Sequence, residues 1–169
     1  RFTFLSARRW LGWSAGDLLV LDIGGGSLEI ARGTDENPAF KTSLQLGAGR
    51  LTRKFLKGDP FTAKSLRALE EYLEDAISPL SQSLSTFEKD VATGTSKTFR
   101  TLAKIAITLF PKFGPHLTYS ALEAMVPKLQ SLDIEGRKAM QSISAERAPQ
   151  IVAGAMVAKE LMKTLSLQE

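Results

Sequence analysis

The chain has 169 residues, 43% of them hydrophobic, and a formal net charge of +4 with a pI near 9.4. This length allows one domain with a proper core and is too short for two large ones. The absence of cysteine excludes disulfides, thiolate catalysis and zinc fingers, and a single histidine, His116, excludes multi-histidine metal sites. We expect His116 to be exposed, because the Phe-Gly-Pro before it is typical of a turn.

No apolar run approaches the ~20 residues that cross a bilayer, and the amino terminus carries arginines without the apolar core of a signal peptide. We therefore expect a cytoplasmic protein with no membrane partner. Positive charge gathers between residues 41 and 67, where Asp59 is the one acid. Such an excess favours a polyanionic partner, but a solvated helix face has the same composition, so both interpretations stay open. The basic residues are Lys41, Arg50, Arg53, Lys54, Lys57, Lys64 and Arg67.

The chain is predicted to form one domain, residues 1–169, in three consecutive parts. Residues 1–16 form an incoming helix, over residues 2–13, and a turn; they begin without an initiating Met, so we expect a piece of a longer protein. Residues 17–110 form a core of sheet and helices, and residues 111–169 a helical part with helices over residues 119–129, 134–142 and 146–165. In the last helix, the small residues 152–155 permit close approach of another element.

Three consecutive strands are predicted over residues 18–23, 28–32 and 40–46. The first is apolar up to Asp22, as expected of a strand buried on both faces. Residues 33–38 are turn formers, so the three strands make an antiparallel meander. Gly47 and Gly49 end the third strand.

The glycine turn between the first two strands carries the most chemical information. Glycine can take positive φ and bring its amides close to a ligand, and a cluster of amides suits phosphate oxygens. Asp22 and Glu29 stand at its two ends, and carboxylates beside phosphate need a cation, so the pair predicts magnesium with oxygen ligands. A glycine-rich hairpin with surface acids fits the same residues. The candidate phosphate ligands of this turn are Gly24, Gly25, Gly26 and Ser27.

Two helices are predicted next. The first covers residues 51–56, and four basic residues spaced i, i+3, i+4 and i+7 give it one basic face: Arg50, Arg53, Lys54 and Lys57. Asp59 and Pro60 are expected to cap the second helix, which Pro79 should kink or break. The second helix has apolar residues every three or four positions, a pattern of core packing. They are Leu66, Leu69, Leu73, Ile77, Leu80, Leu84 and Phe87.

A fourth strand is predicted over residues 90–93, followed by a glycine turn and a helix over residues 96–110. Free amides at such a helix start can take phosphate, although Ser and Thr also cap helices that bind no ligand. The candidate phosphate ligands of this turn are Gly94, Thr95, Ser96 and Lys97. The helix should carry Lys97, Arg100 and Lys104 on one side and Leu102, Ile105 and Leu109 on the other.

This order of elements resembles the second half of an actin, hexokinase and Hsp70 type domain. The resemblance implies an α/β, ribonuclease H-like (actin-like ATPase) lobe, with a mixed sheet that contains an antiparallel three-strand meander and is packed by helices. More narrowly, the chain resembles the exopolyphosphatase and guanosine pentaphosphate phosphohydrolase family. Four blocks carry this resemblance: Leu-Asp-Ile-Gly-Gly-Gly-Ser-Leu-Glu at 21–29, Ser-Leu-Gln-Leu-Gly-Ala-Gly-Arg-Leu-Thr at 43–52, Thr-Gly-Thr-Ser-Lys-Thr-Phe-Arg-Thr-Leu-Ala at 93–103 and Glu-Arg-Ala-Pro-Gln-Ile-Val-Ala-Gly-Ala at 146–155.

The resemblance implies a magnesium-dependent enzyme that hydrolyses a terminal phosphoanhydride of polyphosphate or guanosine pentaphosphate between two lobes. This chain matches the second lobe. Asp22 and Glu29 would be catalytic, holding Mg²⁺ and ordering the attacking water, while both glycine turns would bind phosphate. The family's general base, a glutamate, would lie just before Arg1, so we expect this chain alone to be inactive. The resemblance also leaves room for a homodimer of the full-length protein.

Two other functions fit part of the pattern. In an ATPase or sugar kinase of the same superfamily, the turn at residues 94–98 would contact adenosine, but such proteins usually have Gly-Gly where this chain has Gly-Thr-Ser. A non-catalytic polyanion-binding module would use the basic faces. Nucleic acid is disfavoured as its partner, because base stacking needs exposed aromatics, and residues 41–67 offer only Phe55 and Phe61, both at expected core positions.

Overall fold

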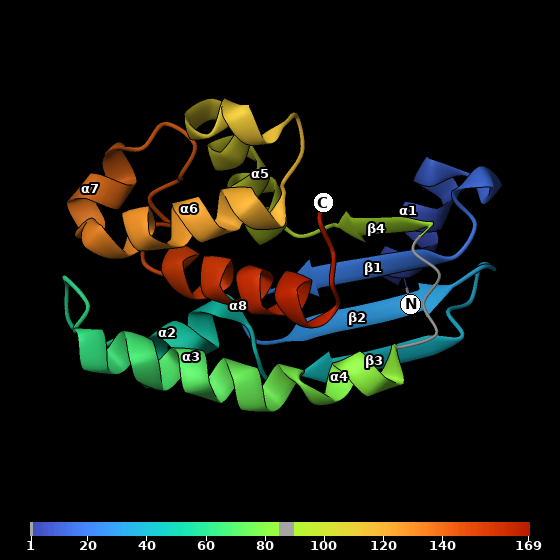
Figure 1. The fold of residues 1–169 in the computed structure, drawn as a ribbon, viewed down its shortest axis with the longest axis horizontal. Helices are drawn as coiled ribbons and strands as arrows, with labels where there is room; N and C mark the ends of the chain where they lie inside the picture. The colour runs from blue at the N-terminus through green and yellow to red at the C-terminus, as the bar shows by residue number, and fades with distance from the viewer. Residues whose placement is uncertain (1, 85–89) are drawn as a thin grey trace.

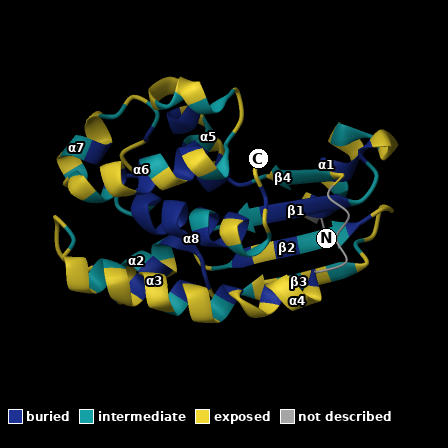
Figure 2. Ribbon diagram, in the orientation of Figure 1, coloured by how far each residue is buried: buried dark blue, intermediate teal, exposed yellow. Residues whose placement is uncertain are grey.

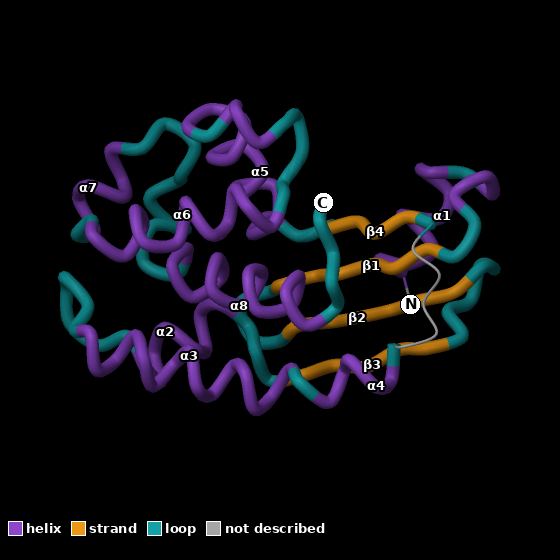
Figure 3. Tube along the Cα trace, in the orientation of Figure 1, coloured by secondary structure: helices purple, strands orange, loops and turns teal. Residues whose placement is uncertain are grey.

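The structure is a computed structural model that describes residues 2–84 and 90–169. Its sheet has four strands in the order β3-β2-β1-β4 (Figures 1 and 3). The strands are β1 (Leu18–Ile23), β2 (Leu28–Gly33), β3 (Phe40–Leu44) and β4 (Val91–Gly94). Neighbours among the first three strands are antiparallel, whereas β4 runs parallel to β1. The predicted meander within a mixed sheet is therefore confirmed.

Helices pack around this sheet, and most of them gather beyond the carboxyl ends of β1 and β4 (Figure 1). No helix within the described ranges combines the length and apolarity needed to span a membrane. The helical elements are α1 (Phe2–Leu11), η1 (Trp13–Ala15), α2 (Ala48–Phe55), α3 (Ala63–Ile77), α4 (Pro79–Ser83), α5 (Lys97–Leu109), η2 (Pro111–Phe113), α6 (Tyr119–Ser131), α7 (Ile134–Ala139) and α8 (Ile151–Thr164).

The two faces of the sheet are covered differently. The odd-numbered residues of β1 belong to the large core cluster with the helices that follow the sheet. Leu18 and Val20 instead pack with Phe4 and Ala7 of α1 in a small second cluster. Because successive side chains of a strand alternate between faces, Asp22 continues the row of Leu18 and Val20 on the α1 side, at the carboxyl end of β1.

Helix α8 is the centre of the helical layer. Nearly all of it is buried (Figure 2), and it contacts α2, α3, α5 and α6. A Cβ atom added at Gly154 would lie 2.6 Å from Cγ2 of Thr98 at the start of α5. This contact confirms the prediction that the small residues 152–155 permit close approach of another element.

Several predicted boundaries are wrong, for local reasons. Helix α1 ends at Leu11 because Gly12 leaves the helix with φ of 78°. Helix α8 begins only at Ile151, because Pro149 has no amide hydrogen to donate and disfavours helical geometry in the residue before it. The predicted break at Pro79 is confirmed, since α3 ends at Ile77 and α4 begins with Pro79.

The apolar patterns of the two amphipathic helices are largely confirmed. Leu69, Leu73, Ile77, Leu80 and Leu84 are buried, and Leu66 packs partly buried against the same cluster. Phe87 lies outside the described residues. In α5, Leu102 and Ile105 are buried, whereas Leu109, predicted on the same side of the helix, lies in the last turn and is 43% exposed.

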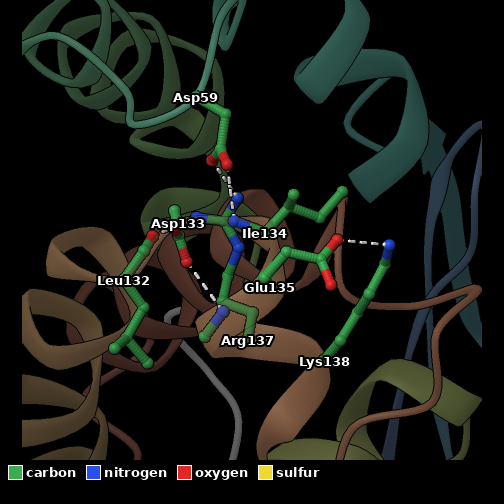
Figure 4. Close-up of polar contacts among 8 residues, drawn as sticks. Asp59, Leu132, Asp133, Ile134, Glu135, Arg137 and Lys138 are labelled. Carbon is green, nitrogen blue, oxygen red and sulfur yellow. Dashed lines mark hydrogen bonds and ion pairs between the residues drawn. The ribbon is translucent and has the colours of Figure 1, made fainter.

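The predicted cap at Asp59 is also wrong. Helix α3 begins at Ala63, and its cap is Thr62, whose hydroxyl accepts the amide of Ser65 at 3.2 Å. The Asp59 carboxylate instead reaches across to α7. It accepts the Ile134 amide at 2.5 Å and Nη2 of the buried Arg137 at 2.6 Å (Figure 4). Asp59 therefore bonds the first amide of a helix 75 residues away in the chain, a helix whose cap is Asp133.

Candidate functional site

A row of oxygen-bearing side chains crosses the sheet at the carboxyl end of β1. Strand register places Asp22 directly opposite Glu29, and Glu29 directly opposite Ser43 on β3. Just past β4, the hydroxyl of Thr95 donates to Oδ2 of Asp22 at 3.2 Å. We call these four residues the oxygen row. It confirms that the two acids predicted as a pair come together. Thr95, predicted as a phosphate ligand, contacts Asp22, and Ser43 adds a hydroxyl that the sequence did not single out.

Hydrogen bonds orient both carboxylates of the oxygen row. Glu29 accepts the hydroxyl of Ser27, and Ser43 lies within 3.5 Å of the same Glu29 oxygen. Burial raises the pKa of Asp22 above its usual range, the hydrogen bond from Thr95 partly lowers it, and the charge of Glu29 raises it further. The row therefore concentrates negative charge at a half-buried position, where a cation would be stabilised.

The glycine loop, residues 24–27, turns its carbonyls toward α2. The carbonyls of Gly24 and Gly25 accept the amides of Ala48 and Arg50, each at 2.9 Å, and Gly26 accepts Nε of Arg50 at 3.0 Å. In a trans peptide the carbonyl oxygen and the following N–H point to opposite sides. The amides of residues 25–27 therefore point away from α2, as an anion-binding loop requires.

Close packing against Gly47 and Gly49 sets this arrangement. A Cβ atom at Gly47 would lie 2.3 Å from the carbonyl carbon of Gly26, and one at Gly49 would lie 3.1 Å from the Gly25 oxygen. The sequence predicted that these two glycines end the third strand, and it placed them in the block at 43–52, but it predicted no contact with the glycine loop. Their signal was the Gly-Ala-Gly spacing directly before the first turn of α2.

The loop glycines do not take positive φ. Positive φ was expected at the turn, yet the glycines with positive φ in the described ranges are Gly12, Gly16, Gly58 and Gly114. Gly25 and Gly26 are exposed, and an added Cβ atom at either would meet nothing within 4 Å. Glycine at these two positions leaves the loop backbone uncovered by side chains. It is not there to permit positive φ.

The second candidate loop, residues 94–97, adjoins the first across β1. Thr95 contacts Asp22, and the hydroxyl of Thr98 donates to the Ile23 carbonyl at 2.9 Å. Ser96 is buried, and its hydroxyl caps α5 by accepting the Phe99 amide at 3.2 Å. Lys97 is exposed in the first turn of α5. The predicted site residues of both loops thus lie at one end of the sheet, whereas their binding of phosphate stays a prediction.

The oxygen row fits a hard cation such as Mg²⁺. Mg²⁺ prefers oxygen ligands, keeps several waters and is commonly held by one or two carboxylates. Asp22 and Glu29 supply two carboxylates, and Ser43 and Thr95 add hydroxyl oxygens beside them. No cluster of three or more acids, histidines or cysteines suited to a metal occurs among the residues that the structure describes. The oxygen row therefore offers a cation two carboxylates, not a complete set of protein ligands.

The predicted basic face of α2 forms only in part, with Arg50, Arg53 and Lys54 on the helix. Helix α2 ends at Phe55, so Lys57 lies beyond it, and the side chain of Arg50 holds the glycine loop. Lys54 lies over the ring of Tyr72, with its Nζ 4.0 Å from the ring centre. The basic residues of segment 41–67 are therefore divided among separate surfaces.

The described residues also line two hollows, and both lie apart from the oxygen row. The larger, of about 570 Å³, runs beside β4 and is bordered by α5, the exposed His116 and residues 166–169. The smaller, of about 270 Å³, lies between α3, α6 and α8. Neither is lined by Asp22 or Glu29. In the oxygen row, Glu29 and Ser43 are exposed and Asp22 is half-buried.

Comparison with known proteins gives consistent matches along the whole chain. The sequence model of the Ppx/GppA phosphatase family matches residues 1–169. Exopolyphosphatase 1 of Mycobacterium leprae is 44% identical over 173 residues, which cover 99% of this chain and 51% of that protein. The guanosine-5'-triphosphate,3'-diphosphate pyrophosphatase of Photobacterium profundum is 26% identical over 156 residues, covering 89% of this chain and 30% of that protein.

Solved structures agree with these matches. The crystal structure of the Aquifex aeolicus member of the Ppx/GppA family superposes with a TM-score of 0.83 at 25% identity, covering 99% of this chain and 55% of that one. This likeness confirms the predicted fold class. The chain spans about half the length of the exopolyphosphatase relatives that it matches.

Proposed function

Because the chain belongs to the Ppx/GppA phosphatase family, we propose that its full-length protein hydrolyses the terminal phosphoanhydride of polyphosphate or of guanosine pentaphosphate. The relatives named above support these two substrates. One observation supports this proposal at the level of residues. The glycine loop adjoins the paired carboxylates of Asp22 and Glu29, and its amides at residues 25–27 point away from α2. Amides attract phosphate oxygens, and a cation between phosphate and the carboxylates would balance the charge.

In this proposal each part of the site has its own role. The amides of residues 25–27, together with the turn at residues 94–97, bind phosphate oxygens and stabilise charge that develops on the transferred phosphoryl group. Within that turn the Thr95 amide is already bonded to the Leu21 carbonyl, so other groups of the turn make this contact. Asp22 and Glu29 hold Mg²⁺ and accept hydrogen bonds from the attacking water. When bound, the cation neutralises phosphate charge. Thr95 and Ser27 orient the two carboxylates through their hydroxyls.

We further propose that this chain is the second of two lobes and is inactive alone. The first phosphate loop and the general base would come from the other lobe, and the oxygen row, in which Glu29 and Ser43 are exposed, leaves room for it. Incubation of the purified 169-residue chain with long-chain polyphosphate and Mg²⁺ should release no phosphate above a blank. Clear release would contradict the two-lobe proposal. A homodimer of the full-length protein and a cytoplasmic location also stay predictions.

Isothermal titration separates the proposed function from its two alternatives. The chain should bind polyphosphate in Mg²⁺ and bind it more tightly than ATP or single-stranded DNA. Preference for ATP would instead indicate an ATPase or sugar kinase lobe. If DNA binds as tightly as polyphosphate, the chain is a general polyanion-binding module. That result would contradict the oxygen row as the binding site.

A further inference from the structure

Lys41 lies on the same face of the sheet as the oxygen row. Strand β3 pairs Lys41 with Ala31 of β2, and pairs Ser43 with Glu29. Lys41 and Ser43 are both exposed, whereas the alternate residues Phe40 and Leu44 pack against the large core. The Lys41 side chain therefore rises from the face that carries the acids, one step along β3 from the row.

The surroundings of Lys41 leave its ammonium group available. Its cross-strand neighbour, Ala31, is an uncharged residue that packs against the small cluster beneath α1, whereas Lys41 itself is exposed. Glu29 is its diagonal neighbour, and such positions lie about 7–8 Å apart, within reach of long side chains. Among the described residues, no carboxylate lies within ion-pair distance of Lys41. A lysine on an edge strand can also serve only to block edge-to-edge pairing, and in that case its charge would not affect the binding of phosphate chains.

We propose that Lys41 is a specificity-determining residue that binds a phosphate group further along a linear phosphoanhydride chain. This inference rests on the proposed function, in which the glycine loop holds the terminal phosphate. From the loop, the chain would run over the face of the sheet toward β3, across strands spaced about 4.8 Å apart. Lysine suits this contact because its ammonium group is a compact charge with three donors on a flexible stem. A single phosphate at the loop would not reach Lys41.

Titration calorimetry of the 169-residue chain in Mg²⁺ tests this inference with two probes, tripolyphosphate and inorganic phosphate. Replacing Lys41 by methionine keeps the length of the stem and removes the charge. We expect Lys41→Met to weaken tripolyphosphate binding about tenfold, because one charge-assisted contact is lost, and to leave phosphate binding unchanged. Lys41→Arg should retain most of the affinity for tripolyphosphate.

A matched control removes a lysine charge elsewhere. Lys64 is exposed on α3, which packs on the opposite side of the sheet, so Lys64→Met should change neither affinity. Unchanged tripolyphosphate binding by Lys41→Met, or equal losses for both probes, would overturn the role of Lys41 alone. Failure of the unmodified chain to bind either anion would overturn the proposed function and this inference together.

The triphosphate group of a nucleotide has the same chemistry as the end of a polyphosphate chain. Titration with guanosine 5'-triphosphate therefore separates the two sources. A loss confined to tripolyphosphate would assign Lys41 to inorganic polyphosphate. Losses with both ligands would assign it to the shared triphosphate, and either result supports the contact.

Discussion

At the scale of single residues, the half-buried carboxylate of Asp22 at the candidate site lowers the stability of the fold at neutral pH. Burial raises its pKa, Thr95 partly lowers it, and Glu29 raises it further. Because the pKa in the folded state is above the unfolded value, ionisation costs stability at neutral pH, and this cost disappears below the unfolded pKa of about 3.9. We expect Asp22→Asn to melt at a higher temperature than the unmodified chain at pH 7, with the difference shrinking toward pH 4.

Thermal unfolding followed by circular dichroism measures this effect. Asp75 is exposed on α3, so Asp75→Asn provides the control and should melt with the unmodified chain at both pH values. A melting temperature of Asp22→Asn below that of the unmodified chain at pH 7 would mean that the carboxylate stabilises the fold.

Gly47 and Gly26 offer a second comparison between single residues. A Cβ atom at Gly47 would collide with backbone atoms of the glycine loop, whereas one at Gly26 would meet nothing within 4 Å. Backbone cannot give way as a flexible side chain can, so Gly47→Ala should lower the free energy of unfolding by about 1–3 kcal/mol. Gly26→Ala should change it little. Urea unfolding of both variants tests the pair, and equal stability would show that the loop adapts to the added methyl.

At the scale of elements, local patterns predicted the molecule well and long-range contacts did not follow from them. Apolar runs and turn residues gave the meander of β1, β2 and β3, and the spacing of leucines gave α3. Helix α2 begins three residues before its predicted start because the glycine loop accepts its first amides. Hydrophobic periodicity is a pattern over the length of one helix. It therefore cannot identify a packing partner that lies more than 20 residues away in the chain.

The link between Asp59 and α7 is the clearest case of such a contact. Arg137 is fully buried, donates to Asp59 and to the Leu132 carbonyl, and stacks on Phe61, with the guanidinium 4.6 Å from the ring centre. Removing the carboxylate leaves a buried charge without its counterion, which is strongly destabilising. We expect Asp59→Ala to lower the free energy of unfolding by about 3 kcal/mol.

The neighbouring ion pair between Glu135 and Lys138 provides the control, because both side chains are exposed. Glu135→Ala should cost less than about 1 kcal/mol in the same chemical denaturation experiment. If the two variants lose similar amounts of stability, Asp59 does not hold the loop before α3 to α7.

At the scale of the whole molecule, one end of the sheet collects residues from distant parts of the chain. The sequence identified Asp22, Glu29 and both candidate loops, because acids and glycines after apolar strands are a local signal. It missed Ser43 and the loop-holding role of Arg50, since these depend on strand register and on the packing of α2. Helix α8 packs against the start of α5, next to the second candidate loop, where Gly154 lies close to Thr98.

We infer that the amides of residues 25–27 and the carboxylates of Asp22 and Glu29 form one site for phosphate and Mg²⁺. Backbone amide NMR of the labelled chain, titrated with inorganic phosphate in the presence of Mg²⁺, tests it most directly. We expect the largest shifts at Gly25, Gly26 and Ser27, and we expect these shifts to be lost in Glu29→Gln. Shifts concentrated on α2 or α3, or unchanged shifts in the variant, would contradict it.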